Sequence, residues 1–222
     1  RRQERDELRV QLLVEQAASI PLQLVEPYGL CMARLDGETL VFVGDKSGNV
    51  EQWRLDEQLR GERQHVFRFA SQTEGCVVDT STRQLFVGEE VTGIWVTDLD
   101  TKSSTLFAAI DGDILKADVE GLDIYDNGDN RWLLASSQGN NSFVLYDLAN
   151  GSVVLRFRVG RNDDGTLDGA SETDGVAVYS AALDDFPRGI LVVQDGRNTH
   201  PRGNQNFKVI DWRKIENLLI EQ

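Results

Sequence analysis

The sequence is short of positive charge, histidine and cysteine, and each shortage excludes a class of function. Its 23 Lys and Arg face 37 Asp and Glu, which gives a formal net charge of −14. Because phosphate contacts to nucleic acid need clustered basic side chains, we expect no nucleic-acid partner. The two His and two Cys have no zinc-binding spacing, so a zinc site is not indicated. Cys31 and Cys76 are expected to be two small buried residues.

Long hydrophobic runs are also missing. No stretch approaches the roughly 18 apolar residues of a membrane span, so we expect none. The first residues, RRQERDELRVQLLVEQ, begin with Arg and contain no apolar signal-peptide core. We assign residues 1–21 to an N-terminal tail, helical or frayed, or to the remnant of a preceding structural unit. The remaining residues, 22–222, contain enough apolar side chains for a sizeable core.

What the sequence does contain is a fourfold repeat. Its units begin PYGL, TEGC, VEGL and TDGV, near residues 27, 73, 119 and 173, and align on Gly29, Gly75, Gly121 and Gly175. Short apolar runs separated by Asp, Asn and Gly clusters indicate four strands in each unit. Four strands in ~45 residues are typical of a propeller blade. We therefore predict an all-β fold for residues 22–222, a β-propeller of four-stranded blades.

The repeat also predicts where polar residues gather. The first strand of a blade is innermost, and the second strand returns to the face where the first began. The entry to the first strand and the turn after the second therefore share one face. The residues before the glycines are Tyr28, Glu74, Glu120 and Asp174, and those of the turns are Asp45, Lys46, Glu89, Glu90, Gln138, Asn140, Gln194 and Asp195. We expect all of them at one end of a central channel.

Such a ring of acids needs counter-charge. Neighbouring carboxylates cannot all stay ionised without a cation. Lys46 alone cannot neutralise Glu74, Glu90, Asp118, Glu120 and Asp174. Oxygen ligands without His or Cys suit a hard cation, Ca²⁺ most naturally. The pattern therefore predicts calcium at this end of the channel.

Several motifs carry a family resemblance. TEGCVVD, ADVEGL, LLASSQGNNSF and GNQNFKVIDW stand in this order between about Leu22 and Leu218. The series resembles the bacterial alkaline, calcium-dependent β-propeller phytases. The resemblance implies six blades, of which about four are visible here. It also implies a secreted or periplasmic protein. It also implies hydrolysis of phytate, bound as a calcium complex, by a metal-activated water.

The resemblance also assigns roles to individual residues. It places Tyr28, Lys46, Glu74, Asp118 and Glu120 in catalysis, and Tyr28, Lys46 and Gln138 in binding the substrate. It gives the metal to Glu74, Glu90, Asp118, Glu120 and Asp174. It also places Asn204 or Asn206 near a further calcium ion.

Two alternatives to this enzyme stay open. With two blades missing, the chain could be an inactive, incomplete propeller that serves as a binding or structural module, or it could be completed by N-terminal blades or by another chain. A lactonase-type propeller with one central metal is the weaker alternative, since the motif series does not resemble that class.

Three further segments have simpler interpretations. YDNGDNR is expected to be a hairpin turn on the opposite face, and RNDDGTLDG a plain loop. DWRKIENLL is expected to form a short helix that Asp211 caps and that packs on the propeller.

Overall fold

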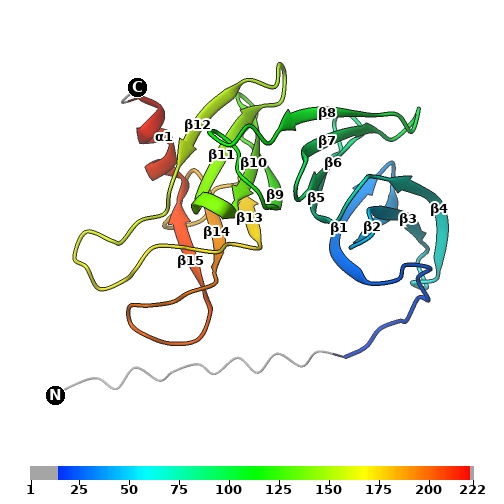
Figure 1. Ribbon diagram of the computed structural model, residues 1–222, viewed down its shortest axis with the longest axis horizontal. Helices are drawn as coiled ribbons and strands as arrows, with labels where there is room; N and C mark the ends of the chain where they lie inside the picture. Colours follow the sequence, from blue (N-terminus) through cyan, green and yellow to red (C-terminus); the bar gives the residue numbers. More distant parts are fainter. Residues whose placement is uncertain (1–14, 221–222) are drawn as a thin grey trace.

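The computed structural model describes residues 15–220, and they form four antiparallel sheets arranged in an arc (Figure 1). The prediction of an all-β propeller is confirmed. The interpretation of residues 1–14 as helical or frayed lies outside the described residues. In the described part, residues 15–26 carry no strand or helix.

Three sheets have four strands each, in chain order from the inside to the outside. The first contains β1 (Pro27–Leu35), β2 (Glu38–Asp45), β3 (Asn49–Leu55) and β4 (Gly61–Arg68). The second contains β5 (Thr73–Asp79), β6 (Gln84–Glu89), β7 (Gly93–Asp98) and β8 (Ser104–Ala109). The third contains β9 (Val119–Asp126), β10 (Arg131–Ser137), β11 (Ser142–Asp147) and β12 (Val153–Phe157), with the short helix η1 (Gln138–Asn140) between β10 and β11.

The fourth sheet has three strands, where the repeat predicted four. It contains β13 (Val176–Tyr179), β14 (Ile190–Asp195) and β15 (Asn206–Asp211). Helix α1 (Trp212–Ile220) follows β15 directly, so the chain leaves the sheet where a fourth strand would begin. The prediction of a fourth strand was wrong for this unit, and in the described chain β15 pairs only with β14.

The cores lie between consecutive sheets, as the period of a strand requires. In β6, Leu85 and Val87 pack toward the first sheet, whereas Phe86 between them packs toward the third. The innermost strands β1, β5, β9 and β13 contact one another in sequence. Each of the two central blades therefore buries apolar side chains against both of its neighbours, and consecutive inner strands lie side by side.

Helix α1 packs on the propeller as predicted, against the third and fourth sheets. The backbone N–H of Arg213 donates to Asp211 Oδ1 over 3.0 Å, which caps the helix start. Trp212 is fully buried, and its ring stacks on Tyr125 with centroids 3.8 Å apart. Asp126–Arg131 forms the expected hairpin turn and residues 161–169 the expected loop. None of the described helices is long and apolar enough to cross a membrane.

The two cysteines form a disulfide instead of a pair of buried thiols. Cys31 on β1 and Cys76 on β5 are half-buried and joined, with Cα atoms 5.5 Å apart. They follow Gly29 and Gly75 by two residues and one residue, so they stand at neighbouring positions of adjacent inner strands. The expectation of two separate buried cysteines was wrong, because the disulfide depends on the contact between β1 and β5, which the spacing of the cysteines in the sequence does not show.

Candidate metal and phosphate site

A repeated hydrogen bond brings the two parts of the predicted site together in three blades. The backbone N–H groups of Lys46, Glu90 and Gln138, in the turn after the second strand, each donate to a carbonyl at the entry of the first strand. The accepting carbonyls are those of Glu26 at 3.3 Å, Gln72 at 3.1 Å and Asp118 at 3.0 Å. This bond is the reason that the side chains from the strand entry and from the turn share one face.

Three glutamates meet at the centre of this face. Carboxylate oxygens of Glu74, Glu90 and Glu120 all lie within 4.8 Å of one another. They come from the starts of β5 and β9 and from the residue after β6. We call these three residues the glutamate cluster. Glu120 is only 5% exposed, whereas Glu74 and Glu90 are half-buried.

In the described residues, no cationic side chain forms an ion pair with the acids of the glutamate cluster. Glu120 Oε2 is buried and has no hydrogen-bond partner. Burial, followed by the hydrogen bond and charge of Glu74, raises the pKa of Glu120 to about 10. Burial also raises the pKa of Glu90, and the charge of Asp118 adds to the effect. A free carboxylate oxygen aimed into a group of acids is what a bound cation would satisfy.

The remaining predicted residues surround the cluster. The Lys46 ammonium lies 4.8 Å from the centre of the exposed Tyr28 ring and forms an ion pair with Glu26 at 2.5 Å. The nearby Glu74 carboxylate raises the pKa of Tyr28, which places Tyr28 beside the cluster. Gln138 Nε2 donates to Asp174 Oδ1 over 2.7 Å.

Four of the expected ring residues point elsewhere. Asp45, Glu89 and Asp195 are fully buried and accept hydrogen bonds from neighbouring loop and turn groups, such as Ser47 N–H at 2.9 Å, Ser71 Oγ at 2.7 Å and Ser171 N–H at 3.1 Å. Each ends a second strand, so its side chain takes the opposite direction from that of the next residue. Asn140 bonds Ser142 at its own turn.

Two residues that contact the site were missed. Gln72 Nε2 donates to Glu90 Oε1, and Glu26 pairs with Lys46. Both stand three residues before the repeated glycine, the place that Asp118 has in the third unit. Aligning that position across the units would have identified them.

The two asparagines proposed for a further calcium lie on the fourth sheet. Asn204 is exposed in the loop before β15. Asn206 begins β15, and its Oδ1 is buried without a hydrogen-bond partner. Both therefore belong to the fourth blade, whereas the glutamate cluster comes from the second and third.

Comparisons with known proteins identify the family and the fold of the chain. The sequence profile of the phytase family matches residues 3–222. A 3-phytase of Bacillus subtilis (strain 168) is 35% identical over 217 residues, which are 91% of this chain and 56% of that protein. The chain thus spans little more than half the length of this curated relative. The solved structure of U3-55K shares the fold, with a TM-score of 0.51 at 15% identity, over 84% of this chain and 52% of that one.

Proposed function

The chain belongs to the phytase family, and on that premise we propose that it is part of a calcium-dependent phosphomonoesterase that removes phosphate from phytate. The single observation that carries the proposal is the glutamate cluster with the unpartnered oxygen of Glu120. Phytate is a polyanion, and bridging cations at the glutamate cluster would reverse the repulsion between its phosphates and these carboxylates.

The donor set fits calcium. Ca²⁺ takes six to eight oxygen ligands, and carboxylates are preferred among them. Glu74, Glu90 and Glu120 would hold the ion, with Asp118 and Asp174 beside them. Calcium bound there would neutralise phosphate charge and lower the pKa of a coordinated water.

The surrounding side chains would orient the substrate. Glu26 raises the pKa of Lys46, and Glu74 raises that of Tyr28, so both residues keep their protons near neutral pH. Each can therefore donate a hydrogen bond to a phosphate oxygen as negative charge develops. The hydrogen bond from Gln138 to Asp174 would fix the side-chain amide of Gln138 at the edge of the site, where it could contact the substrate.

We further infer that additional blades complete the ring. A Cβ on Gly29 or Gly75 would lie 1.8 Å from a backbone oxygen of the next blade, whereas no described atom lies within 4 Å of one on Gly175. Exposed Phe207 and Val209 on β15, together with Leu30 and Met32 on β1, leave apolar surface on the terminal blades. These features favour blades from a longer chain, or from another chain, at both ends of the arc.

A location outside the reducing cytosol is part of the proposal. Disulfides persist mainly in oxidising compartments, and Cys31–Cys76 is one. This supports the secreted or periplasmic placement that the family resemblance implies.

The test is phosphate release from phytate at mildly alkaline pH, with Ca²⁺ and with a chelator. We expect release that requires Ca²⁺, its loss in Glu120→Gln, and its retention in the matched control Glu57→Gln, which changes an exposed glutamate away from the cluster. Release that persists in the chelator or in Glu120→Gln would contradict the proposal. If phytate binds with Ca²⁺ but no phosphate appears, the alternative of a binding module is supported.

A further inference from the structure

A second polar cavity opens beside the proposed site, and its charge has the opposite sign. It has a volume of about 530 Å³ and is lined by three cationic side chains, Lys116, Arg156 and Arg158, with Asn140, Ser142 and a single acid, Asp113. We call it the basic cleft. It is an unusual feature in a chain with 37 acids and 23 bases.

Two arginines stand at the end of β12. Leu155 and Phe157 in this strand are buried, whereas Arg156 in the strand and Arg158, which directly follows it, are exposed. Both arginines line the basic cleft. Arg156 Nη1 donates to the Asp113 backbone oxygen at 2.5 Å and lies 3.5 Å from Asp113 Oδ1.

Lys116 and Arg158 are not compensated in this way. In residues 15–220, neither has a carboxylate within ion-pair distance, and both are exposed. The cleft therefore presents at least two free positive charges, with hydrogen-bonding side chains beside them. Guanidinium groups match the geometry of phosphate oxygens, and an ammonium adds a compact charge.

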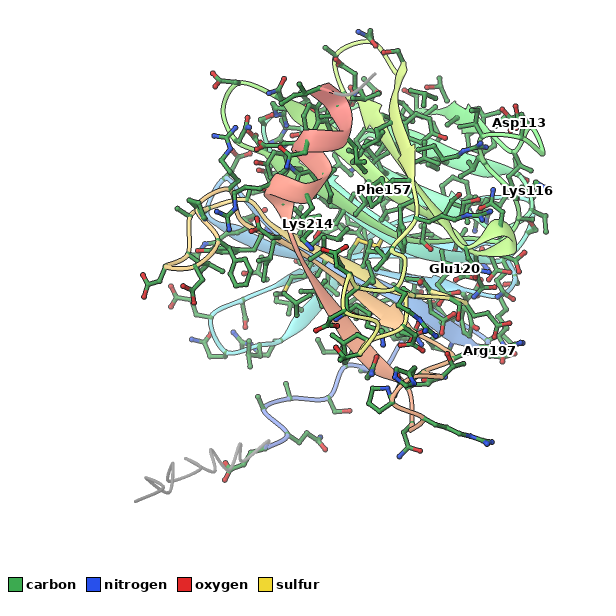
Figure 2. All side chains as sticks on the ribbon, turned by 90° about the vertical axis from the view of Figure 1, so that its left-hand side faces the viewer. Asp113, Lys116, Glu120, Phe157, Arg197 and Lys214 are labelled. Atoms are coloured by element: carbon green, nitrogen blue, oxygen red, sulfur yellow. A yellow bond between two sulfur atoms is a disulfide. The ribbon has the colours of Figure 1, made fainter. Side chains whose placement is uncertain are left out.

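The cleft lies next to the glutamate cluster. Lys116 is two residues before Asp118 and four before Glu120, which places its Cα within about 14 Å of that of Glu120. Asn140 follows Gln138 in η1. Figure 2 shows Asp113, Lys116 and Glu120 toward the same side of the molecule, with Lys214 away from them.

We propose that the basic cleft binds a phosphate group without calcium, either a remote phosphate of the polyphosphorylated substrate or released inorganic phosphate. The choice of phytate as the ligand rests on the proposed function. Binding of a phosphate group is argued from the cationic residues of the basic cleft alone. A substrate with several phosphates could thus occupy the calcium-dependent site and the basic cleft together.

The experiment measures calorimetric binding of phytate and, separately, of inorganic phosphate to this chain in excess chelator. The variants are Lys116→Glu and Arg158→Glu, and the matched control is Lys214→Glu, which makes the same charge change on α1. We expect wild type and the control to bind phytate alike, and each cleft variant to bind about tenfold more weakly or worse. Circular dichroism of every variant, compared with wild type, is the control for correct folding.

The outcomes distinguish a remote phosphate of the substrate from released inorganic phosphate. They also distinguish failure of the basic cleft proposal from failure of the proposed phosphatase activity. An equal loss of inorganic phosphate binding identifies the product as a ligand, whereas a loss confined to phytate identifies a remote substrate phosphate. Equal affinities for Arg158→Glu, Lys116→Glu and Lys214→Glu, or no binding by wild type, would overturn the cleft proposal even if Ca²⁺-dependent phosphate release is intact. Conversely, the cleft stands if binding behaves as expected while no phosphate is released.

Discussion

The backbone oxygen of Glu120 lies so close to Gly75 that a Cβ on the glycine would be 1.8 Å away from it. The same relationship joins Glu74 to Gly29. Glycine at these two places lets neighbouring inner strands approach closely. At Gly29 and Gly75 the close packing of neighbouring inner strands therefore accounts for the glycine, and it places Glu74 and Glu120 on adjacent strands.

This packing predicts that Gly75→Ala and Gly175→Ala differ sharply. The methyl group of Gly75→Ala would collide with backbone, which cannot move aside like a flexible side chain. We expect a loss of about 3 kcal/mol in the free energy of unfolding, at the upper end for overpacking. Gly175→Ala meets open space and should change it by less than about 0.5 kcal/mol. Urea denaturation of both variants measures the difference.

The variants Gly75→Ala and Gly175→Ala also test whether additional blades complete the ring. If further blades cover Gly175 in a longer chain, Gly175→Ala should destabilise that protein as Gly75→Ala destabilises this one. A neutral Gly175→Ala in the longer protein would argue against a blade packed there. A neutral Gly75→Ala in this chain would contradict the packing itself.

The pKa of Glu120 predicts how stability depends on pH without metal. Its folded value is raised to about 10, above the ordinary value of about 4.3 in an unfolded chain. The unfolded state therefore releases this proton first, and the metal-free protein should lose stability as the pH rises from about 4.3 toward 10. Glu120→Gln, which stays neutral, should flatten this dependence.

Calcium should stabilise wild type more than Glu120→Gln, the opposite of the order expected without metal at high pH. Ligand binding to the folded state alone stabilises it by mass action, so Ca²⁺ should raise the Tm of wild type and of the control Glu57→Gln. Glu120→Gln should gain much less. Thermal denaturation between pH 5 and 9, with Ca²⁺ or chelator, measures both effects, and a similar gain in all three proteins would argue against the cluster as the calcium site.

The blade repeat and the central acids could be predicted from the sequence because both recur in register. Glu74 and Glu120 stand directly before aligned glycines, and the alternation of apolar residues marks the strands. The direction of Glu89 could not be predicted, since Glu89 and Glu90 are adjacent and one residue reverses the side chain. The absence of a fourth strand from the last sheet could not be predicted either, because helix α1 follows β15 directly. Nor could the disulfide, because it depends on a contact between two blades.

The Cys31–Cys76 disulfide predicts a stability loss on reduction. It joins the first two blades across a sequence separation of 45 residues. Constraining an unfolded loop of this size is worth about 2–4 kcal/mol. We expect the double variant Cys31→Ser/Cys76→Ser to show this loss in urea denaturation, and reductant to lower the Tm of wild type. The double variant serves as the control, because reductant should not affect it.

The buried ammonium of Lys208 supplies the last prediction. Its Nζ lies 2.5 Å from Asp168 Oδ1 and 3.1 Å from Asp195 Oδ2, and the side chain is 9% exposed. The loop predicted as plain, residues 161–169, is thus tied to β15 by an ion pair. Lys208→Met would leave two carboxylates without their cation, and removing one partner of a buried pair is strongly destabilising. Exposed Lys214→Met is the matched control.

The same ion pair sets the direction of the pH effect. The hydrogen bond from Lys208 holds the pKa of Asp168 far below its ordinary value. Its contribution is therefore fully present above about pH 3.9 and is lost as the pH falls through the folded pKa. We expect the Tm of Lys208→Met to lie well below that of wild type at neutral pH, and the gap to narrow in strong acid. A gap that is constant with pH, or one as small as that of Lys214→Met, would mean that the ion pair does not stabilise the fourth blade.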